Sequence, residues 1–359
     1  MLEDRCRAQG GNPPPPPPAP DAVAAAAGVD PLRAVAAPRR SERRAAALGR
    51  TRALHPETTG AHVTTTPLTV AVLGPGGVGG LIGALLARDG HRVLCLAGES
   101  TAAVLDTDGL HVESARYGEF TAAVEADTVL RRPVDALLVT VKQTALEAAL
   151  DRVPADVLGG AVVVPLLNGL DHPAVLRGRY PAARVAAGTI RVEATRTAPG
   201  RIVHGSPFAD VQLAAPVDDL ADALRTAGLG VTLRTDESAM LWEKLAFLAP
   251  FALLTTRYRA GAGTVRSDRR PELAAVVDEV TAVARAAGTA VRSEDVLGFF
   301  DRSPHGMRSS MQRNAEAGRP LELDAIGGAV LRAAAAHGIG APATARLVAD
   351  VARSTGREG

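Results

Sequence analysis

Buried-strand patterns alternate with helical spacing in the first patterned region, which begins at residue 68. Residues 68–73 and 92–96 form short apolar runs rich in β-branched side chains, typical of buried strands. Residues 80–88 between them carry apolar side chains at helical spacing. Two more runs of the buried-strand type occupy 134–141 and 161–167. This alternation predicts an α/β fold whose parallel sheet is covered by helices.

The pattern then passes through more strands and changes to helices near residue 236. A hairpin is expected at 111–114 and 119–124, further strands at 185–190, 201–204, 211–213 and 231–234, and a helix at 218–227. Helical spacing predicts helices at 238–257, 271–288, 293–301, 305–317, 322–337 and 342–354. We therefore predict an α/β N-terminal domain at 67–235 and an all-α C-terminal domain at 236–355.

Residues 1–66 differ from the rest of the chain. They contain a proline run at 13–18 and clustered arginines, but no Lys, Phe, Tyr or Trp to build a core. This composition predicts a disordered low-complexity tail. An organellar transit peptide would be poor in acidic residues, whereas this segment holds six of them. A tail that binds a partner is a further alternative.

Composition and charge exclude several classes of protein. The chain is 47% hydrophobic and 22% charged with a net charge of +1, which favours neither nucleic acid nor an anionic membrane surface as a partner. Cys6 and Cys95 lie far apart and offer neither a metal site nor a disulfide framework, which favours the reducing cytoplasm. Apolar runs are shorter than the ~20 residues that span a bilayer.

A glycine-rich motif follows the first predicted strand. It reads Gly74, Pro75, Gly76, Gly77, Val78 and Gly79. The first glycine allows a tight turn, Gly76 lets the backbone approach a pyrophosphate, and Gly79 allows close packing of helix on strand. Because the motif joins a strand to a helix in a strand–helix–strand unit, it predicts a Rossmann-type dinucleotide-binding domain rather than a merely structural turn.

The end of the second strand bears on the choice between NAD and NADP. An acidic residue there binds the ribose 2′-hydroxyl, whereas a basic residue accommodates a 2′-phosphate. Glu99 favours NAD, but a solvated loop glutamate explains it equally well.

Scarce residue types occur where chemistry is expected. Only two of the 40 basic residues are lysines, Lys142 and Lys244. Unlike arginine, a desolvated lysine can exchange a proton near neutral pH. Lys142 and Asn168 each end a predicted parallel strand, so both should reach the edge of the sheet that carries Gly74. Taken singly, a solvated strand-end charge and a turn asparagine are alternatives.

Several short motifs, taken together, resemble the ketopantoate reductase (2-dehydropantoate 2-reductase) family over about residues 68–350. They are the glycine motif, Lys142 with Gln143, Asn168 with Gly169, Leu241-Trp-Glu-Lys244-Leu, and Ser309-Ser310-Met311 followed by Glu322. The resemblance implies reduction of a ketone by a nicotinamide cofactor, with NADPH expected and NADH possible.

The resemblance also implies residue roles. Lys244 would donate a proton to the ketone oxygen, and Glu322 would hold a substrate hydroxyl and help set the charge of the lysine. Ser310 would lie near the substrate carboxylate and Asn168 between nicotinamide and substrate. The cofactor-binding residues would be the glycine motif, Lys142, Asn168 and Ala194. A cationic donor suits this chemistry because hydride transfer builds negative charge on oxygen.

Three positions depart from the family pattern. Leu248 and Ala252 stand where the family has asparagines that line the substrate cleft, and Gly98 replaces its arginine for the NADP 2′-phosphate. An apolar cleft favours a more apolar ketone over a polyhydroxy acid. We therefore expect NAD(P)H-dependent reduction of a 2-keto acid, ketopantoate first, by a cytoplasmic monomer or homodimer. A reductase of a more apolar ketone and a nucleotide-binding regulatory protein without catalysis are the alternatives.

Overall fold

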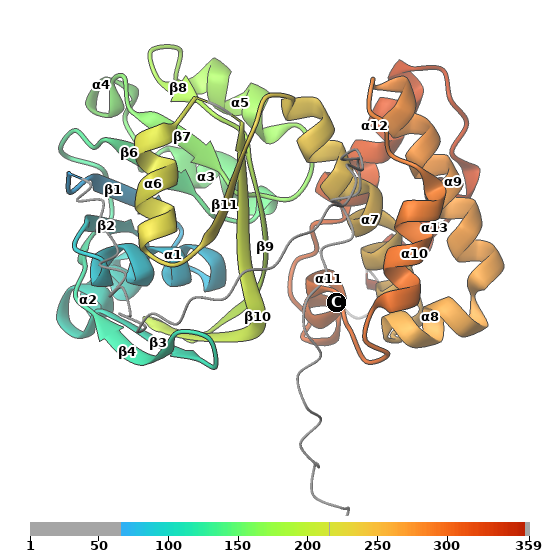
Figure 1. The fold of residues 1–359 in the computed structure, drawn as a ribbon, viewed down its shortest axis with the longest axis horizontal. Helices are drawn as coiled ribbons and strands as arrows, with labels where there is room; N and C mark the ends of the chain where they lie inside the picture. Colours follow the sequence, from blue (N-terminus) through green and yellow to red (C-terminus); the bar gives the residue numbers. More distant parts are fainter. Residues whose placement is uncertain (1–65, 215, 356–359) are drawn as a thin grey trace, which may run out of the picture. The chain divides into compact units, whose positions relative to one another are not determined.

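The computed structural model describes residues 66–214 and 216–355, and Figure 1 shows an α/β part followed by a helical part. This arrangement confirms the predicted fold class. The described residues belong to one compact unit. The predicted tail at 1–66 lies outside the described residues except for Thr66. The predicted division at 67–235 and 236–355 stays a proposal.

A parallel sheet of six strands forms the centre of the α/β part. Its order is β5-β2-β1-β6-β7-β8, and each neighbouring pair is parallel. The strands are β1 (Thr69–Leu73), β2 (Arg92–Leu96), β5 (Glu125–Asp127), β6 (Ala136–Val139), β7 (Val162–Pro165) and β8 (Arg184–Val185). Both faces of β1 are covered, because Val70 and Val72 belong to one hydrophobic core and Ala71 and Leu73 to another.

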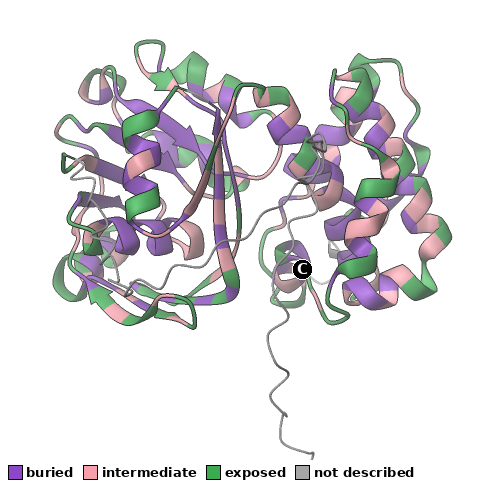
Figure 2. Ribbon diagram, in the orientation of Figure 1, coloured by how far each residue is buried: buried purple, intermediate pink, exposed green. Residues whose placement is uncertain are grey.

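Helices pack on the two faces of this sheet. They are α1 (Gly77–Arg88), α2 (Glu99–Asp108), α3 (Leu146–Leu150), α4 (Ala155–Leu158), α5 (His172–Arg179) and α6 (Asp218–Thr226), with a 3₁₀ turn η1 (Gln143–Ala145). Leu81 of α1 and Leu220 of α6 pack in the core that includes Val70, whereas Leu146 of α3 and Leu176 of α5 pack in the core that includes Leu73. The two helices α1 and α6 therefore share a face of the sheet, and Figure 2 shows buried and exposed residues alternating along α6.

A second, mixed sheet lies beside α1. It contains β3 (Leu110–Ser114), β4 (Gly118–Ala122), β9 (Gly188–Ala198), β10 (Arg201–Ala214) and β11 (Gly230–Arg234). The predicted hairpin is confirmed as the antiparallel pair of β3 and β4. The expectation of separate strands at 201–204 and 211–213 was wrong, because β10 runs through both. Its pairing with β9 shifts register between His204 and Ala209, which absorbs the break in pattern at Gly205 and Pro207.

The helical part is organised around α7 (Glu237–Tyr258). Asp236 caps this helix by accepting a hydrogen bond from the Ala239 N–H at 2.9 Å. The other elements are α8 (Ala262–Asp268), α9 (Arg270–Ala286), α10 (Ser293–Arg302), α11 (Ser310–Glu316), a π-helical segment η2 (Asp324–Gly328), α12 (Ala329–Ala336) and α13 (Pro342–Thr355). Helix α7 is long and apolar enough to cross a bilayer, but 72% of its apolar window is buried inside the protein, as in the core helix of a soluble protein.

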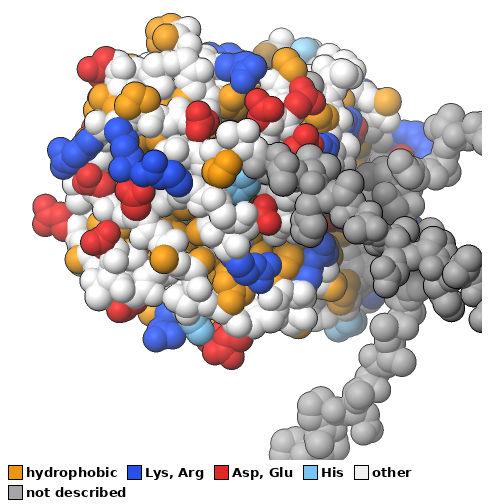
Figure 3. Space-filling model, turned by 60° about the vertical axis from the view of Figure 1, so that its left-hand side comes forward, with side chains coloured by type: hydrophobic (Ala, Val, Ile, Leu, Met, Phe, Trp, Pro, Cys, Tyr) orange, Lys and Arg blue, Asp and Glu red, His pale blue; other side chains and the backbone are white. Residues whose placement is uncertain are grey.

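Acidic and basic side chains lie interspersed on the face drawn in Figure 3. Many of the arginines in the described part pair with nearby carboxylates. Arg234 with Glu243 at 2.8 Å and Arg177 with Glu237 at 2.6 Å are two such pairs, and both hold the first turns of α7. The surface therefore carries mixed charge on this face rather than a field of one sign.

Candidate active site

Three of the predicted site residues follow the carboxyl ends of neighbouring strands. Gly74 follows β1, Lys142 follows β6, and Asn168 follows β7. The strand ends are level across the sheet, and the paired terminal positions are Leu96, Leu73, Val139 and Pro165. All three residues therefore come to one edge of the sheet, where ligands bind in open α/β folds.

Three glycines of the motif stand where a side chain would clash with a neighbouring atom. Gly74 has φ +84°, which favours glycine, and a Cβ there would lie 2.4 Å from the Val141 side chain. A Cβ at Gly79 would lie 2.7 Å from the Gly74 carbonyl oxygen. A Cβ at Gly77 would lie 2.1 Å from the carbonyl oxygen of Ala194 on β9, so this glycine lets α1 approach the second sheet.

Gly76 differs from the other glycines of the motif because it faces open space. The nearest atom to a Cβ at Gly76 is the Gly74 carbonyl oxygen, 3.9 Å away. Gly76 is also the N-cap of α1, and no side chain of residues 66–214 or 216–355 caps that helix end. The first N–H groups of α1 are therefore available to an anion, and a bare backbone borders the space before them. This cradle fits the pyrophosphate of a dinucleotide.

Thr140 stabilises the glycine motif, although sequence analysis did not select it. Its hydroxyl lies 2.8 Å from the Gly74 carbonyl oxygen and 3.1 Å from that of Leu73. Thr140 directly follows β6, between the strand and Lys142, so its position in an apolar run was the only available signal.

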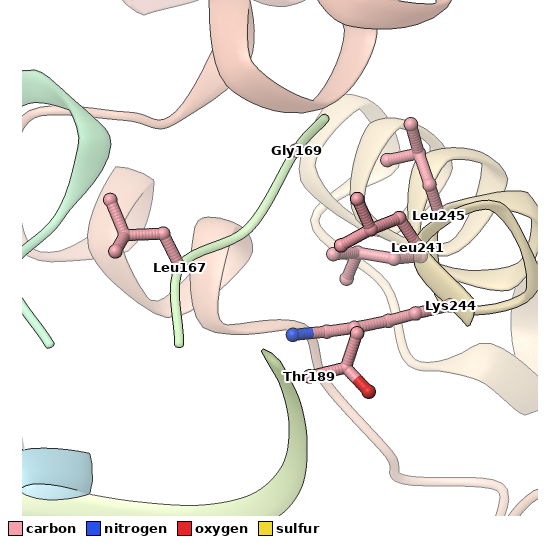
Figure 4. A pocket seen from close by; sticks show the side chains of 7 residues that line it. Leu167, Gly169, Thr189, Leu241, Lys244 and Leu245 are labelled. Atoms are coloured by element: carbon pink, nitrogen blue, oxygen red, sulfur yellow. The ribbon is translucent and has the colours of Figure 1, made fainter. Parts of the chain in front are cut away.

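Lys244 extends from α7 toward the strand ends, as Figure 4 shows. It lines a small pocket together with Leu167, Gly169, Thr189, Leu241, Leu245 and Leu248. The loss of water lowers the pKa of Lys244 to about 8, and the charge of Glu322 opposes this shift by favouring the ammonium form. Lys244 can therefore exchange a proton close to neutral pH.

Glu322 links the helical part to the edge of the sheet. It is 8% exposed and accepts hydrogen bonds from Asn168 Nδ2 at 3.3 Å and from the Gln143 N–H at 3.4 Å. Close backbone packing supports this link, because a Cβ at Gly169 would lie 2.6 Å from the carbonyl oxygen of Ala325. Asn168 and Glu322 are thus brought together directly, and Lys244 lies within the electrostatic reach of Glu322.

Lys142 also lies within the electrostatic reach of Glu322. Its side chain is exposed at the start of η1. Partial burial lowers the pKa of Lys142, the charge of Glu322 raises it, and the charge of Arg319 lowers it. The two lysines of the chain therefore approach one carboxylate from opposite parts of the fold.

Of the remaining predicted residues, some lie at the Lys244 pocket and others lie away from it. Leu248 lines the Lys244 pocket, and Ala194 packs against Gly77. Ser310 is exposed at the start of α11. An ion pair of 3.0 Å between Arg313 of this helix and Glu193 links α11 to β9. Ala252 is fully buried in the helical core and does not line the pocket, so a substrate contact at Ala252 stays a prediction without support from this geometry.

His172 is a buried neighbour of Lys244 that sequence analysis did not select. It begins α5 and is 1% exposed, and neither of its ring nitrogens has a hydrogen-bond partner among the described residues. Burial, and secondarily the charge of Lys244, lower the pKa of His172 to about 3. The imidazole is therefore neutral at physiological pH and adds no positive charge beside the lysine.

Comparison with known proteins identifies the family to which the chain is similar. A model of the "Ketopantoate reductase PanE/ApbA" family matches residues 70–243, and a model of the C-terminal part of the same family matches residues 237–353. The 2-dehydropantoate 2-reductase of Halobacterium salinarum is 30% identical over 81% of this chain and 100% of its own length.

Solved structures share the fold. A PanE/ApbA family ketopantoate reductase from Ralstonia eutropha has a TM-score of 0.73 at 25% identity, covering 81% of this chain and 99% of its own. A D-mandelate dehydrogenase with NADH and anilino(oxo)acetate has a TM-score of 0.73 at 20% identity, covering 81% of this chain and 99% of its own. The second of these likenesses concerns the fold alone.

Proposed function

We propose, because the chain belongs to the ketopantoate reductase PanE/ApbA family, that it reduces the ketone of a 2-keto acid to the 2-hydroxy acid. The chain is an oxidoreductase of a family that uses NAD(P)H. The observation that carries the proposal is a lysine with a pKa of about 8, beside a buried carboxylate, at the edge of the sheet that bears the glycine motif.

Lys244 is the proton donor in this proposal. A reduced nicotinamide, when bound, would supply a hydride to the ketone carbon, and negative charge would develop on the ketone oxygen. The Lys244 ammonium stabilises that charge and transfers its proton to the oxygen. A pKa of about 8 leaves the ammonium populated at neutral pH while making the proton transfer easier than from an ordinary lysine.

Glu322 and Asn168 position the reacting groups. The negative charge of Glu322 raises the Lys244 pKa and so keeps the lysine protonated. Glu322 also presents carboxylate oxygens that can accept a hydrogen bond from a substrate hydroxyl, while its hydrogen bond to Asn168 Nδ2 orients that amide at the sheet edge. Ser310, which is exposed on α11, is proposed to contact the substrate carboxylate.

Two substrate classes are candidates, one suggested by the family and one by the lining of the pocket. The family makes ketopantoate the first substrate to test, and that assignment would place the reaction in pantothenate biosynthesis in the cytoplasm. Four leucines line the Lys244 pocket, among them Leu248. This lining favours a 2-keto acid with a branched or otherwise apolar side chain as the second candidate.

The test is oxidation of NADPH and NADH by the purified protein with ketopantoate and with branched-chain 2-keto acids. The proposal expects turnover with at least one of them, and Leu248→Asn should shift the preference toward ketopantoate. Folded protein that binds a nicotinamide cofactor yet turns over none of these acids would refute the proposal. That outcome would favour a nucleotide-binding regulatory role instead.

A further inference from the structure

The end of β2 is where a dinucleotide-binding fold distinguishes NADP from NAD. Here Ala97 follows the strand, Gly98 is the N-cap of α2, and Glu99 lies in the first turn of that helix. Gly98 and Glu99 are both exposed. Neither residue supplies a positive charge, so this segment alone gives a 2′-phosphate no partner.

Arg152 brings a positive charge to this place from a distant segment. It lies between α3 and α4, in the connection from β6 to β7. Its Nη1 donates hydrogen bonds to the carbonyl oxygens of Ala97 at 3.0 Å and Thr128 at 2.9 Å. Ala97 follows β2 and Thr128 follows the neighbouring strand β5, so the guanidinium is fixed at the carboxyl edge of these two strands.

The other side of the guanidinium faces Gly98. A Cβ built at Gly98 would have one neighbour within 4 Å, Arg152 Nη2, at 4.0 Å. Within the described residues, Nη2 and Nε of Arg152 donate to no partner and no carboxylate pairs with this arginine. A side chain larger than hydrogen at residue 98 would occupy the space beside Nη2, which glycine leaves open.

Nearby charges leave this cation available. The acidic residue at the end of β5, Asp127, is held by Arg131 through a 2.9 Å ion pair, which lowers the pKa of Asp127. Arg131 and Asp127 thus satisfy each other, whereas the side chain of Arg152 has two carbonyl oxygens and no carboxylate as partners in the part of the chain that the structure describes. A guanidinium already fixed in place, with two free donor positions, is well suited to bind a phosphate.

We propose that Arg152 binds the 2′-phosphate of NADP(H) and makes this chain prefer NADP(H) over NAD(H). Gly98 contributes by leaving room for the phosphate against Nη2. This inference rests on the proposed dinucleotide site at the glycine motif, and it makes Arg152 a specificity residue for the cofactor. Arg152 has no part in the proton transfer.

Direct binding tests the inference without any turnover. The full-length wild type and the Arg152→Gln variant are each titrated with NADP⁺ and with NAD⁺ in a calorimeter. Arg152→Gln should weaken NADP⁺ binding by roughly 10- to 100-fold, the range expected for charged hydrogen bonds to a phosphate. NAD⁺ binding should stay within about threefold, since NAD⁺ lacks this phosphate. Arg131→Gln is the matched control at the same edge and should leave the NADP⁺/NAD⁺ affinity ratio unchanged.

Two further measurements separate binding from a structural role. Gly98→Arg placed in the Arg152→Gln background should restore much of the NADP⁺ affinity, because it returns a cation to the same space. Equal weakening of both cofactors by Arg152→Gln, or an unchanged NADP⁺/NAD⁺ ratio, would overturn the inference and leave Arg152 as a cap for two carbonyls. Absence of keto acid reduction would sink the proposed reaction but would leave this binding comparison intact.

Discussion

At the scale of single residues, burial removes water from around the Lys244 ammonium, and the nearby negative charge of Glu322 compensates in part. Burial favours the neutral amine, the carboxylate favours the ammonium, and the neutral His172 adds no charge of its own. The balance gives Lys244 a pKa of about 8 instead of the usual 10.5.

A pH profile of kcat should report this balance. Because the protonated amine is the donor, kcat should fall as pH rises above about 8. In Glu322→Gln the compensating charge is absent, so the alkaline limb should move to lower pH. Measurement of kcat between pH 6 and 10 for both proteins gives the comparison, and a limb that stays in place or moves upward in the variant would contradict the assigned coupling.

Because His172 is buried in its neutral form, the free energy of unfolding should depend on pH in the acid range. Its pKa is about 3 in the folded protein and 6.5 in the unfolded chain, so the unfolded chain binds the extra proton as pH falls. The stability linked to neutral His172 is complete above pH 6.5 and is lost progressively as pH falls toward 3.

Urea unfolding at pH 7 and pH 4.5 tests the role of His172. The wild-type free energy of unfolding should fall more than that of His172→Leu, by up to about 2 kcal/mol. His337→Gln, a change at an exposed histidine, should behave as the wild type. Parallel losses in all three proteins would show that His172 is not buried in its neutral form.

Which residues the sequence could identify depends on where their partners lie. Lys244, Asn168 and the glycine motif could be found because scarcity and local spacing single them out. His172, Thr140 and Arg152 could not, because burial and contacts with segments far along the chain give each its setting. An orphaned imidazole or a guanidinium held by two carbonyls leaves no local pattern.

At the scale of elements, the start of α1 serves both packing and binding, and two adjacent glycines separate these roles. Gly77→Ala should lower the melting temperature markedly, at a cost of about 1–3 kcal/mol, because its methyl would meet the Ala194 backbone. Gly76→Ala should keep the melting temperature, since its methyl meets nothing closer than 3.9 Å. It should still weaken cofactor binding about tenfold or more by filling the space for the pyrophosphate.

Thermal unfolding and cofactor titration of the two glycine variants provide the check. If Gly76→Ala bound the cofactor as tightly as wild type, the pyrophosphate would have to lie elsewhere. If Gly77→Ala were as stable as wild type, α1 could move away from β9 without lowering the stability of the fold.

Long periodic elements were predicted well, and short or interrupted ones were not. Helix α9 could be recognised by its apolar period, and helix α7 and strands β1 and β2 by their nearly continuous apolar stretches. Helix α8 was missed because seven residues give barely two turns. Helix α11 begins at Ser310 and not at 305, since Ser309 provides the cap by accepting from the Gln312 N–H.

At the scale of the whole described structure, the site depends on contacts between the α/β part and the helical part. Glu322 receives hydrogen bonds from two strand-end segments, and Arg332 of α12 pairs with Asp171, just before α5, at 2.6 Å. Neither part alone assembles Lys244, Glu322 and Asn168. The order of motifs along the chain made this convergence predictable, but the individual bridging contacts could be seen only in three dimensions.

The most direct test of the account is kcat of Lys244→Met with saturating NADPH and the best 2-keto acid. Methionine keeps much of the volume of the side chain and removes the proton. If Lys244 is the proton donor, kcat should fall by roughly 10²- to 10⁴-fold while the cofactor affinity stays near that of wild type. A variant that retains full kcat would contradict the central claim that Lys244 is the proton donor.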